Sequence, residues 1–416
     1  MDFARSSDAA VQAQLDRLSK LSPIGDRLGL ERIAAMLERL GRPQDDLPPV
    51  FHVAGTNGKG STCAFLRAGL EAAGYTVHLF TSPHLVRFNE RIRIAGKLIG
   101  DRELAALLTE VLDASAGIEP SFFEVATAVA LLAFARTPAD ACILEVGLGG
   151  RLDATNVIEH PLVCGIASIG LDHQHFLGSS IEEIAAEKAA IAKPGVPLVS
   201  VFQPPEAIEA IERVARERGA PLLLEGRDWS ANETFVTALP GIHQLPNANL
   251  AWRMLSAQDR LTVSDEQFRR GIAQASWPAR LQRLKPGPLV RERETWLDGG
   301  HNPAAARHIA DFVRANFVDG KSLNLIFASL ATKDPRGMLE PFAGLVAKVH
   351  CVPIPDHDCF APDDLAQIAS QMGFVASSFA DVRDAVAAVP ANDRLLIFGS
   401  LYLAGVVLGA NSEIPD

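Results

Sequence analysis

Short apolar runs alternate along the chain with longer stretches in which apolar residues recur at helical spacing. The runs are rich in Val, Ile and Leu and are too short for typical helices, so we expect strands. They lie at residues 49–54, 75–81, 141–146, 162–169 and 196–201. Helical spacing occurs before Gly41 and again at 61–73, where Gly74 is expected to end the helix. Short buried strands separated by helices are typical of a parallel α/β sheet.

This alternation breaks at residues 285–288, where the sequence is Lys-Pro-Gly-Pro. Pro and Gly at this density disfavour regular structure, so we expect a domain boundary there. Beyond it, strands are expected at 295–297, 323–328, 346–352 and 394–398, and helices near Asn302, Pro335, Pro362 and after Gly399. The predicted organisation is an α/β domain over residues 1–284, followed by a smaller Rossmann-like α/β domain over residues 289–416.

The composition narrows the class of protein. The 416 residues are 48% hydrophobic and 21% charged, as in soluble globular proteins. A net charge of -11 argues against nonspecific binding to nucleic acid or membranes, because both need a basic surface. The longest apolar run, 125–135, is too short to span a bilayer, and we find no secretory signal. The five cysteines form no CxxC pair, so we expect reduced thiols in a cytoplasmic protein.

The strongest local signal is the run Val-Ala-Gly-Thr-Asn-Gly-Lys-Gly-Ser-Thr at residues 53–62, between a predicted strand and a predicted helix. Glycines let backbone N–H groups converge on an anion, and the helix adds its positive end. Lys59 can then reach the β- and γ-phosphates of a nucleotide, and a following hydroxyl can face Mg²⁺. The alternative is an ordinary strand-to-helix turn. The candidate ATP-binding residues here are Asn57, Gly58, Lys59, Gly60, Ser61 and Thr62.

The loop departs from the standard Walker sequence, because Gly60 separates the lysine from the hydroxyl residue and position 53 is not glycine. This variant resembles the loop of the Mur ligase superfamily, and within it the branch of dihydrofolate synthase and folylpolyglutamate synthase. Four more motifs resemble the same branch, in the same order. They are TSPHLVRFNER at 81–91, LEVGLGGRLDATN at 144–156, LDH at 171–173 with EK at 187–188, and DGGHNP at 298–303 with GSLY at 399–402.

Polar groups at predicted strand ends suggest a Mg²⁺ site. Glu145 ends a strand at the carboxyl edge, where α/β sheets bind ligands, and Ser82 ends another. Mg²⁺ prefers oxygen ligands, so His173 joins this set only because the resemblance implies a histidine there. Without the resemblance, Glu145 could be a salt-bridged strand end and His173 a structural histidine. The expected metal ligands are Ser61, Ser82, Glu145, His173 and Lys188.

Lys188 lies in a predicted helix that begins near Ser179 or Ser180, where Glu183 can complete a capping box. The resemblance implies that this lysine is carboxylated by CO₂, which would place a carbamate near a second Mg²⁺. Because a carbamate forms from the neutral amine, a desolvated lysine with a lowered pKa would favour it. The alternative is an exposed helix lysine.

The resemblance also implies a pocket for dihydropteroate. Phe123 could stack on a pterin ring and Asp153 could hydrogen-bond the edge of that ring. Phe122 and Phe123 are also core candidates, and we expect at least one of them in the core. The expected substrate residues for the pterin and glutamate are Ser22, Gly25, Ser121, Phe123, Glu124, Leu152, Asp153, Ala154, His301 and Ser400.

Two further stretches, 243–248 and 277–280, resemble nucleotide-contacting motifs. They imply that Asn247 and Arg280 contact ATP, and that Asp298 does so from the second domain. Ala279 stands where the family usually has Gly, and Gly300 stands where Ala is usual.

The implied activity is an ATP-dependent amide ligase. Transfer of the γ-phosphoryl group converts a substrate carboxylate into an acyl phosphate, which the amine of L-glutamate attacks. ATP and two Mg²⁺ ions are the expected cofactors, dihydropteroate and reduced folates the expected acceptors, and a monomer the expected state. The expected catalytic residues are Lys59, His173, Lys188, Asp298 and His301.

Two alternatives remain open at this point. A Mur-type peptidoglycan ligase would share the chemistry but fits the GKGS and LEVGLGGRLDATN motifs less well. A P-loop NTPase acting as a switch would leave Glu145, His173, Asp298 and His301 without a role.

Overall fold

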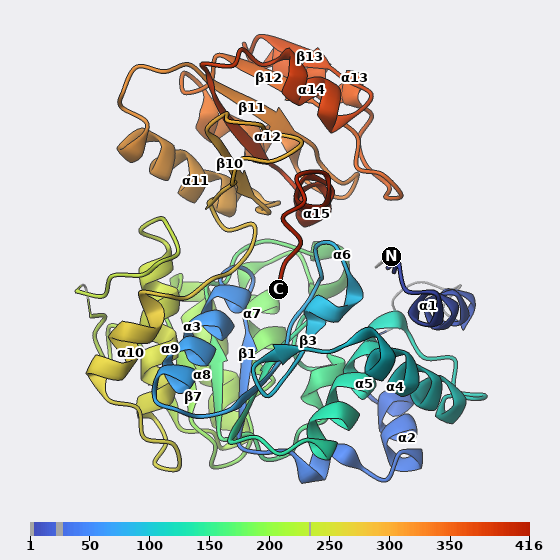
Figure 1. The fold of residues 1–416 in the computed structure, drawn as a ribbon. Coiled ribbons are helices and arrows are strands. Elements are labelled where there is room, and N and C mark those ends of the chain that lie inside the picture. Colours follow the sequence, from blue (N-terminus) through green and yellow to red (C-terminus); the bar gives the residue numbers. More distant parts are fainter. Residues whose placement is uncertain (1–3, 22–27, 233) are drawn as a thin grey trace. The chain divides into compact units, whose positions relative to one another are not determined.

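The computed structural model describes residues 4–21, 28–232 and 234–416, and it divides into two compact units (Figure 1). Unit 1 comprises Met1–Ala238 and Gln244–Ser276, and unit 2 comprises Leu239–His243 and Trp277–Asp416. The division therefore precedes the predicted boundary at 285–288, because residues 282–283 already pair with the second sheet as an edge strand. Within the described part of the chain, no helix is both long and apolar enough to cross a membrane.

Unit 1 is built on a sheet of eight strands in the order β4-β3-β2-β5-β1-β6-β7-β8. Strands β2, β5, β1, β6, β7 and β8, which are adjacent in this order, pair in parallel, as predicted. β3 and β4 form an antiparallel edge next to β2, which was not predicted. The strands are β1 Val50–Ala54, β2 Val77–Phe80, β3 Ile92–Ile94, β4 Lys97–Leu98, β5 Ala141–Glu145, β6 Val163–Ile166, β7 Leu198–Ser200 and β8 Leu222–Leu224.

Helices cover both faces of this sheet (Figure 1). A Cβ at Gly165 of β6 would overlap Met254, so α9 packs on one face, whereas the adjacent residues Cys164 and Ile166 pack with α7 and α8 on the other. The helices are α1 Ala9–Leu21, α2 Glu31–Arg39, α3 Lys59–Ala72, α4 Asp101–Ala114, α5 Phe122–Arg136, α6 Gln174–Leu177, α7 Ile181–Ala189, α8 Pro205–Arg218, α9 Gln244–Ser256 and α10 Asp265–Ile272. Short 3-10 turns lie at η1 Pro43–Asp46, η2 Phe88–Arg91 and η3 Ala154–Val157.

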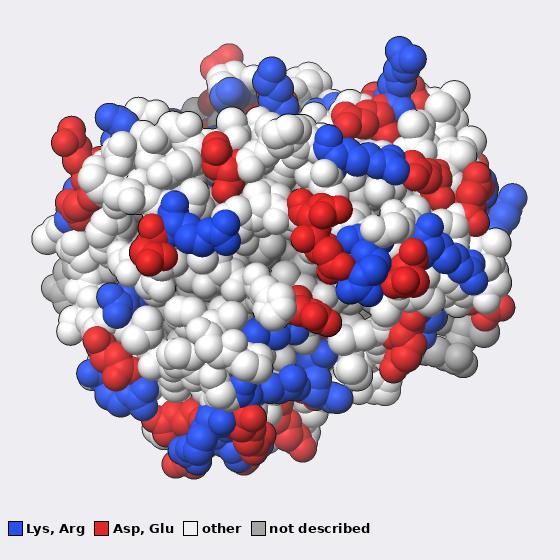
Figure 2. All heavy atoms as spheres, turned by 90° about the horizontal axis from the view of Figure 1, so that it is seen from below, with Lys and Arg blue, Asp and Glu red and all other residues white. Residues whose placement is uncertain are grey.

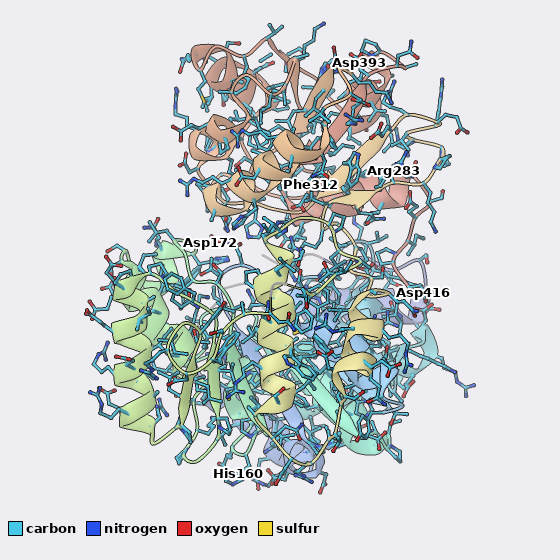
Figure 3. The ribbon with its side chains drawn as sticks, turned by 90° about the vertical axis from the view of Figure 1, so that its left-hand side faces the viewer. His160, Asp172, Arg283, Phe312, Asp393 and Asp416 are labelled. Carbon is cyan, nitrogen blue, oxygen red and sulfur yellow. The ribbon has the colours of Figure 1, made fainter. Side chains whose placement is uncertain are left out.

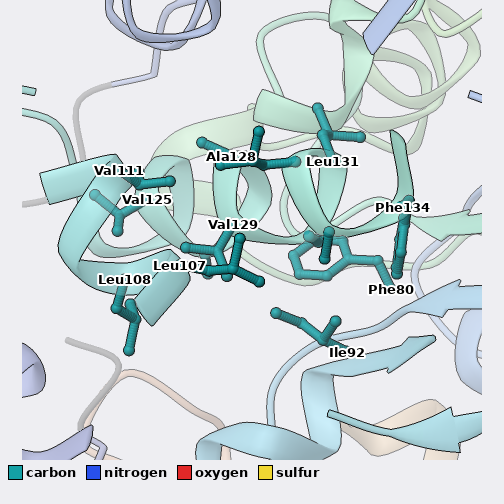
Figure 4. Close-up of a cluster of buried hydrophobic side chains, with 14 of the residues drawn as sticks. Phe80, Ile92, Leu107, Leu108, Val111, Val125, Ala128, Val129, Leu131 and Phe134 are labelled. Atoms are coloured by element: carbon teal, nitrogen blue, oxygen red, sulfur yellow. The ribbon is translucent and has the colours of Figure 1, made fainter. Parts of the chain in front are cut away.

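Apolar side chains from α4, α5, β2 and β3 form one core cluster of unit 1 (Figure 4). Phe80, Ile92 and Val129 are fully buried in it. α5 contributes buried residues on nearly all its faces, which explains why its sequence is apolar without a clear period. The run at 125–135 is therefore a core helix.

Unit 2 contains a second sheet of six strands in the order β13-β12-β11-β14-β10-β9, parallel except for β9. The strands are β9 Gln282–Arg283, β10 Thr295–Asp298, β11 Leu323–Phe327, β12 Lys348–Cys351, β13 Ala376–Ser378 and β14 Arg394–Phe398. The helices are α11 Pro303–Asn316, α12 Pro335–Leu339, α13 Pro362–Gln371, α14 Val382–Ala388 and α15 Leu401–Ala410, with η4 at Glu340–Phe342. The α/β class is the predicted one in both units.

Charged side chains of both signs are interspersed over the face shown in Figure 2. No continuous basic surface covers that face, which agrees with the acidic net charge of the chain.

Candidate active site

The phosphate loop, defined here as residues 55–60, joins β1 to α3 in the predicted strand–loop–helix arrangement. Gly58 precedes the helix with a φ of 90°, in the left-handed region that favours glycine. A Cβ at Gly58 would overlap the amide oxygen of Asn247 in α9. Thr56 N donates to the carbonyl oxygen of Ser168, just beyond β6, at 2.8 Å. The loop is thus held by its neighbours while its tip stays partly exposed.

Lys59 is the first residue of α3, and its amine lies over the phosphate loop. Nζ donates to the carbonyl oxygens of Gly55 and Thr56 at 3.1 and 3.4 Å. Ser61 and Thr62 follow in the first turn and are both buried, and Thr62 Oγ1 has no hydrogen-bond partner among the described residues. A buried hydroxyl without a partner costs about 1–3 kcal/mol, so a polar ligand group bound at this turn would remove that cost.

Glu145 ends β5 beside the phosphate loop. Only 5% of it is exposed, and its Oε2 accepts a hydrogen bond from Ser82 N, just after β2, at 3.4 Å. Burial and then the Glu145 charge raise the pKa of the Cys63 thiol in α3, whereas the Lys59 charge lowers it. The charges of Glu145 and Lys59 therefore both influence the pKa of the buried Cys63 thiol, which indicates that both groups lie near it at this edge of the sheet.

The predicted metal ligands do not make a complete site from protein groups alone. Among the residues that the structure describes, no group of three or more His, Cys, Asp or Glu could hold a metal ion. Mg²⁺ is often bound by one or two carboxylates together with nucleotide phosphates, and Glu145 with the hydroxyls of Ser61 and Ser82 fits that pattern.

The predicted ligand His173 lies at the N-terminus of the short helix α6. It has a φ of 51°, is exposed, and donates its backbone N–H to Asp172 Oδ1 at 2.8 Å. Asp172 follows β6 and lies at the carboxyl end of the unit 1 sheet, whereas His160, before β6, lies at the opposite end (Figure 3). His173 therefore lies on the correct edge of the sheet, although its side chain is solvent-exposed.

Lys188 lies in α7, which begins after Ser180 with the predicted capping box to Glu183. Only 4% of Lys188 is exposed, so the exposed-lysine alternative is wrong. Burial, and then the charge of Lys59, lower the pKa of Lys188 from 10.5 to about 7, while Asp172 and Asp153 oppose this. Lys188 is thus a buried amine whose neutral form is well populated near pH 7, and the charge of the phosphate-loop lysine contributes to this.

The Asp153 loop, defined here as residues 147–153, links β5 to η3. Asp153 is 2% exposed, and its Oδ2 accepts hydrogen bonds from Gly147 N and Leu148 N at 3.0 and 2.9 Å. Its Oδ1 accepts from Thr155 N and Thr155 Oγ1 at 2.9 and 2.5 Å. Burial raises the pKa of Asp153, and these hydrogen bonds oppose the shift.

These four hydrogen bonds occupy the four acceptor positions of the carboxylate. A hydrogen bond between Asp153 and the edge of a pterin, as predicted, would have to share one of these acceptor positions. In the structure, the hydrogen bonds of Asp153 hold its own loop in place. Leu152 is partly buried beside it and Ala154 is buried at the start of η3.

The Asp153 loop packs closely on α7 and α5. A Cβ at Gly150 would lie 2.6 Å from the carbonyl oxygen of Glu187 and 2.9 Å from that of Lys188. A Cβ at Gly147 would overlap the ring of Phe123. Because Gly150 and Gly147 have no side chains, the loop can pack against the backbone at Lys188 and against the ring of Phe123.

Phe122 and Phe123 both pack against the core of unit 1 but remain partly exposed. The Phe123 ring lies 5.7 Å from that of Phe80, and the Phe122 ring lies 5.2 Å from the guanidinium of Arg91. Phe123 thus has one side against protein and retains exposed surface that a planar ligand could cover.

Ser121 and Glu124, predicted as substrate residues, form the N-terminal capping box of α5. Ser121 N donates to Glu124 Oε2 at 2.6 Å, and Glu124 N donates to Ser121 Oγ at 3.2 Å. Arg32 forms an ion pair with the same Oε2 at 3.0 Å, whereas the buried Oε1 has no hydrogen-bond partner in the described part of the chain. The Ser-x-x-Glu signature of a capping box was present in the sequence, and the sequence analysis did not use it.

In unit 2, the predicted residues gather where β10 ends. Asp298 is 4% exposed and accepts hydrogen bonds from Leu281 N and Gly300 N at 2.8 and 2.7 Å. Burial raises the pKa of Asp298, and the charges of Arg280 and His301 lower it. His301 Nδ1 lies 3.1 Å from the carbonyl oxygen of Gly299. Asp298, Arg280 and His301 therefore form one polar cluster.

The two departures from the family pattern lie in this cluster. Ala279 has a φ of 55°, where glycine would be favoured, and its carbonyl oxygen accepts from Gly299 N at 2.9 Å. A Cβ at Gly300 would lie 2.9 Å from Ala305 Cβ and 3.0 Å from Asp298 Oδ1. Alanine at Gly300 would therefore need its neighbours to move.

The remaining predicted substrate residues are placed as follows. Ser400 is buried at the N-terminus of α15, where its Oγ accepts from Tyr402 N at 3.1 Å. Ser22 and Gly25 lie outside the described residues.

Three polar residues beside these sites were missed. His308 of α11 stacks on His243 with 5.2 Å between ring centroids. His52 and Thr155 adjoin Asp153, and no local pattern marked His52, which is one polar residue in an apolar run.

Comparison with known proteins accounts for this arrangement. Residues 288–410 match the family described as dihydrofolate synthetase, C-terminal domain. The chain is 38% identical to dihydrofolate synthase/folylpolyglutamate synthase of Bacillus subtilis over 356 residues, which cover 78% of this chain and 81% of the relative.

Solved structures agree over nearly the whole length. Escherichia coli FolC in complex with DHPP and ADP superposes with a TM-score of 0.87 at 32% identity, over 98% of each chain. The bifunctional folylpolyglutamate synthase/dihydrofolate synthase of Yersinia pestis, complexed with AMPPNP and Mn ion, gives 0.84 at 33% identity, over 97% of this chain and 99% of that one. The chain therefore belongs to the dihydrofolate synthase/folylpolyglutamate synthase family of ATP-dependent ligases.

Proposed function

We propose that the protein uses ATP to join L-glutamate to dihydropteroate and to reduced folates. The observation that carries this proposal is the convergence of Lys59, Glu145 and the low-pKa Lys188 on one edge of the unit 1 sheet. A phosphate loop alone would serve many nucleotide-binding proteins. A buried lysine beside it whose neutral form is accessible near pH 7 suits a ligase whose activity depends on a modified side chain.

The reaction starts with activation of the acceptor carboxylate. One of its oxygens attacks the γ-phosphorus of ATP, ADP leaves, and an acyl phosphate forms. Lys59 neutralises charge on the β- and γ-phosphates, while the other phosphate-loop residues, with Asn247 and Arg280, orient the nucleotide. The amine of L-glutamate then attacks the acyl carbon, inorganic phosphate leaves and an amide remains.

We assign the metal-binding role to Glu145, Ser61, Ser82 and His173, with a carboxylated Lys188 near a second ion. Mg²⁺ bound there would supply Lewis-acid stabilisation of the phosphoryl oxygens. The 4% exposure and the pKa of about 7 support carboxylation of Lys188, because a neutral amine is the form that reacts with CO₂. Formation of the carbamate should fall below pH 7, where the amine is protonated.

Carboxylation can be measured directly. Protein equilibrated with isotopically labelled bicarbonate should show one carbamate carbon signal by NMR at pH 8, weaker at pH 6, and none in Lys188→Arg. A signal of equal strength in Lys188→Arg would assign the carbamate to another group.

We propose that the acceptor pocket lies beside Phe123 and the Asp153 loop, which pack against each other at Gly147. Phe123 presents its exposed ring surface to the pterin, and the buried Glu124 Oε1 offers a further acceptor nearby. Asp153 gives the pocket its shape through the loop. Asp298, His301 and Ser400 of unit 2 would contact the nucleotide and the glutamate. We further propose a cytoplasmic monomer, in keeping with five free cysteines.

The central test is phosphate release by the purified protein with ATP, Mg²⁺ and L-glutamate, comparing dihydropteroate, tetrahydrofolate and a UDP-sugar peptide precursor as acceptor. We expect turnover with both pterins. Turnover with one pterin would restrict the activity to it, and turnover with only the UDP-sugar, or without any acceptor, would overturn the proposal.

A further inference from the structure

A buried polar chain runs from the middle of β1 to the Asp153 loop. His52, the third residue of β1, is fully buried, and its Nε2 lies 2.8 Å from Thr155 Oγ1. Thr155 is also fully buried, and its Oγ1 donates to Asp153 Oδ1 at 2.5 Å. The side chains of His52, Thr155 and Asp153 thus form a buried chain of two hydrogen bonds.

The number of protons fixes the direction of these hydrogen bonds. The single hydroxyl proton of Thr155 goes to Asp153, which also accepts from three backbone N–H groups and so acts as a carboxylate. Thr155 Oγ1 can then only accept from His52, so Nε2 carries the imidazole proton. Burial lowers the pKa of His52 to about 3, with a further contribution from the charge of Lys193, so the ring stays neutral.

A second buried histidine in the same sheet shows what a purely structural role looks like. His78 of β2 is fully buried, and its Nε2 lies 2.9 Å from the carbonyl oxygen of Thr137. Its Nδ1 accepts from Ala95 N at 3.0 Å, and its ring stacks on Phe134 at 4.6 Å. Both ring nitrogens of His78 therefore hydrogen-bond to backbone. Among the residues that the structure describes, the only hydrogen-bond partner of His52 is the Thr155 side chain, and Nδ1 of His52 has none.

We propose that His52 is a positioning residue for the acceptor site, which it acts on through Thr155 and Asp153. His52 holds the Thr155 hydroxyl toward Asp153. Asp153 in turn fixes the backbone N–H groups of Gly147 and Leu148 and so holds the loop that packs on Phe123 and lines the pocket. This inference rests on the proposed function, in which the Asp153 loop lines the acceptor pocket.

The geometry explains why a polar residue occupies the centre of an apolar strand. A threonine side chain can adopt several rotamers, and the one in this structure lets the Thr155 hydroxyl donate to Asp153 Oδ1. A second hydrogen bond, from His52, selects that rotamer. β1 also leads directly into the phosphate loop, so the same strand connects to that loop and, through His52, contacts Thr155 beside the Asp153 loop.

The test compares four variants in pairs. Thr155→Val removes the hydroxyl while keeping the shape, and Thr155→Ser keeps the hydroxyl. His52→Leu removes the donor, and His52→Gln keeps an N–H donor at a similar distance. We expect Thr155→Val and His52→Leu to raise the KM for dihydropteroate by about tenfold, with the KM for ATP within about twofold of wild type. Thr155→Ser and His52→Gln should recover most of the loss.

His78→Leu is the matched control, because it removes a buried imidazole from the neighbouring strand β2. It should lower the melting temperature without raising the KM for dihydropteroate. Equal increases in both KM values for Thr155→Val and His52→Leu, or an acceptor KM raised as much by His78→Leu, would overturn the inference. If Thr155→Val does not fold, the His52 pair gives the same contrast. A wild-type protein inactive on both pterins would instead count against the proposed function.

Discussion

The phosphate loop and the Asp153 loop leave the carboxyl ends of two paired strands, β1 and β5, and both are glycine-rich, yet they are stabilised differently. The phosphate loop is fixed through backbone contacts to the segment after β6, and its one charged side chain, Lys59, stays partly exposed. The Asp153 loop is fixed from within by a buried carboxylate. The first loop presents charge to a ligand, whereas the second uses its charge to hold its own shape.

This difference separates two kinds of sensitivity to mutation. Loss of a charge that faces a ligand should reduce activity and leave stability nearly unchanged. Loss of a charge that holds a loop should reduce both, and should affect most the ligand that the loop touches. Variants at the two loops can therefore be sorted by comparing kinetics with thermal unfolding.

The largest effect is expected from Lys59→Ala. Its two hydrogen bonds to loop carbonyls are partly exposed, so the fold should survive, while the phosphates lose their main protein cation. We expect turnover to fall by about a thousandfold, as for loss of a key group that stabilises transition-state charge. Steady-state phosphate release measures this, with the melting temperature as control. Residual activity within tenfold of wild type would contradict the assigned role.

Asp153→Ala should reduce both stability and activity. Three N–H groups and one hydroxyl lose their acceptor, so we expect a loss of about 2–3 kcal/mol in unfolding free energy. We expect kcat/KM for dihydropteroate to fall by about a hundredfold and that for reduced folates by less, because their glutamate tail supplies binding contacts outside the pterin pocket. Equal losses on both acceptors would refute a pterin pocket at this loop.

Lys188→Met tests the buried amine by pH. The pKa of Lys188 is about 7 in the fold against about 10.5 for an unfolded lysine, so unfolding takes up a proton between these values and wild-type stability should fall as pH drops from 10 toward 7. Methionine has no proton to take up. In CO₂-free buffer, urea unfolding should therefore show a gain for Lys188→Met of a few kcal/mol at pH 7 that vanishes near pH 10. A gain independent of pH would mean that the amine is not neutral in the fold.

The sequence was sufficient for the elements that create these loops. The strands at 141–146 and 394–398 and the capping box at Ser180 were predicted within a residue or two, because apolar runs and local cap signatures are short-range patterns. The hairpin of β3 and β4 was missed, since strands of two or three residues carry no detectable period. The edge strand β9 was missed for the same reason, because it has only two residues.

The polar residues were harder to predict. The phosphate loop is one contiguous motif, so Lys59 could be assigned from sequence. Asp153 was identified by resemblance, but its four internal hydrogen bonds depend on how the loop folds back on itself. His52 reaches Thr155 across 103 positions of sequence, and such a contact exists only after β1 and β5 have paired. Local patterns cannot show which strands become neighbours.

The smallest effect is expected from a pair of glycine variants that isolate one contact of the phosphate loop. Gly58 and Gly74 have nearly the same φ, 90° and 93°, but a Cβ at Gly58 would overlap the Asn247 amide, whereas a Cβ at Gly74 would meet nothing within 4 Å. Both alanine variants should lose about 1 kcal/mol from the left-handed backbone.

Gly58→Ala should lose about 1 kcal/mol more, because Asn247 must move, and its KM for ATP should rise severalfold while Gly74→Ala keeps the wild-type value. Chemical unfolding and ATP titrations of the two variants measure this difference. Adding Asn247→Ala to Gly58→Ala should recover the additional loss of about 1 kcal/mol but not the KM, since we propose that Asn247 also contacts the nucleotide. If the double variant recovered both, Asn247 would serve only to support the loop.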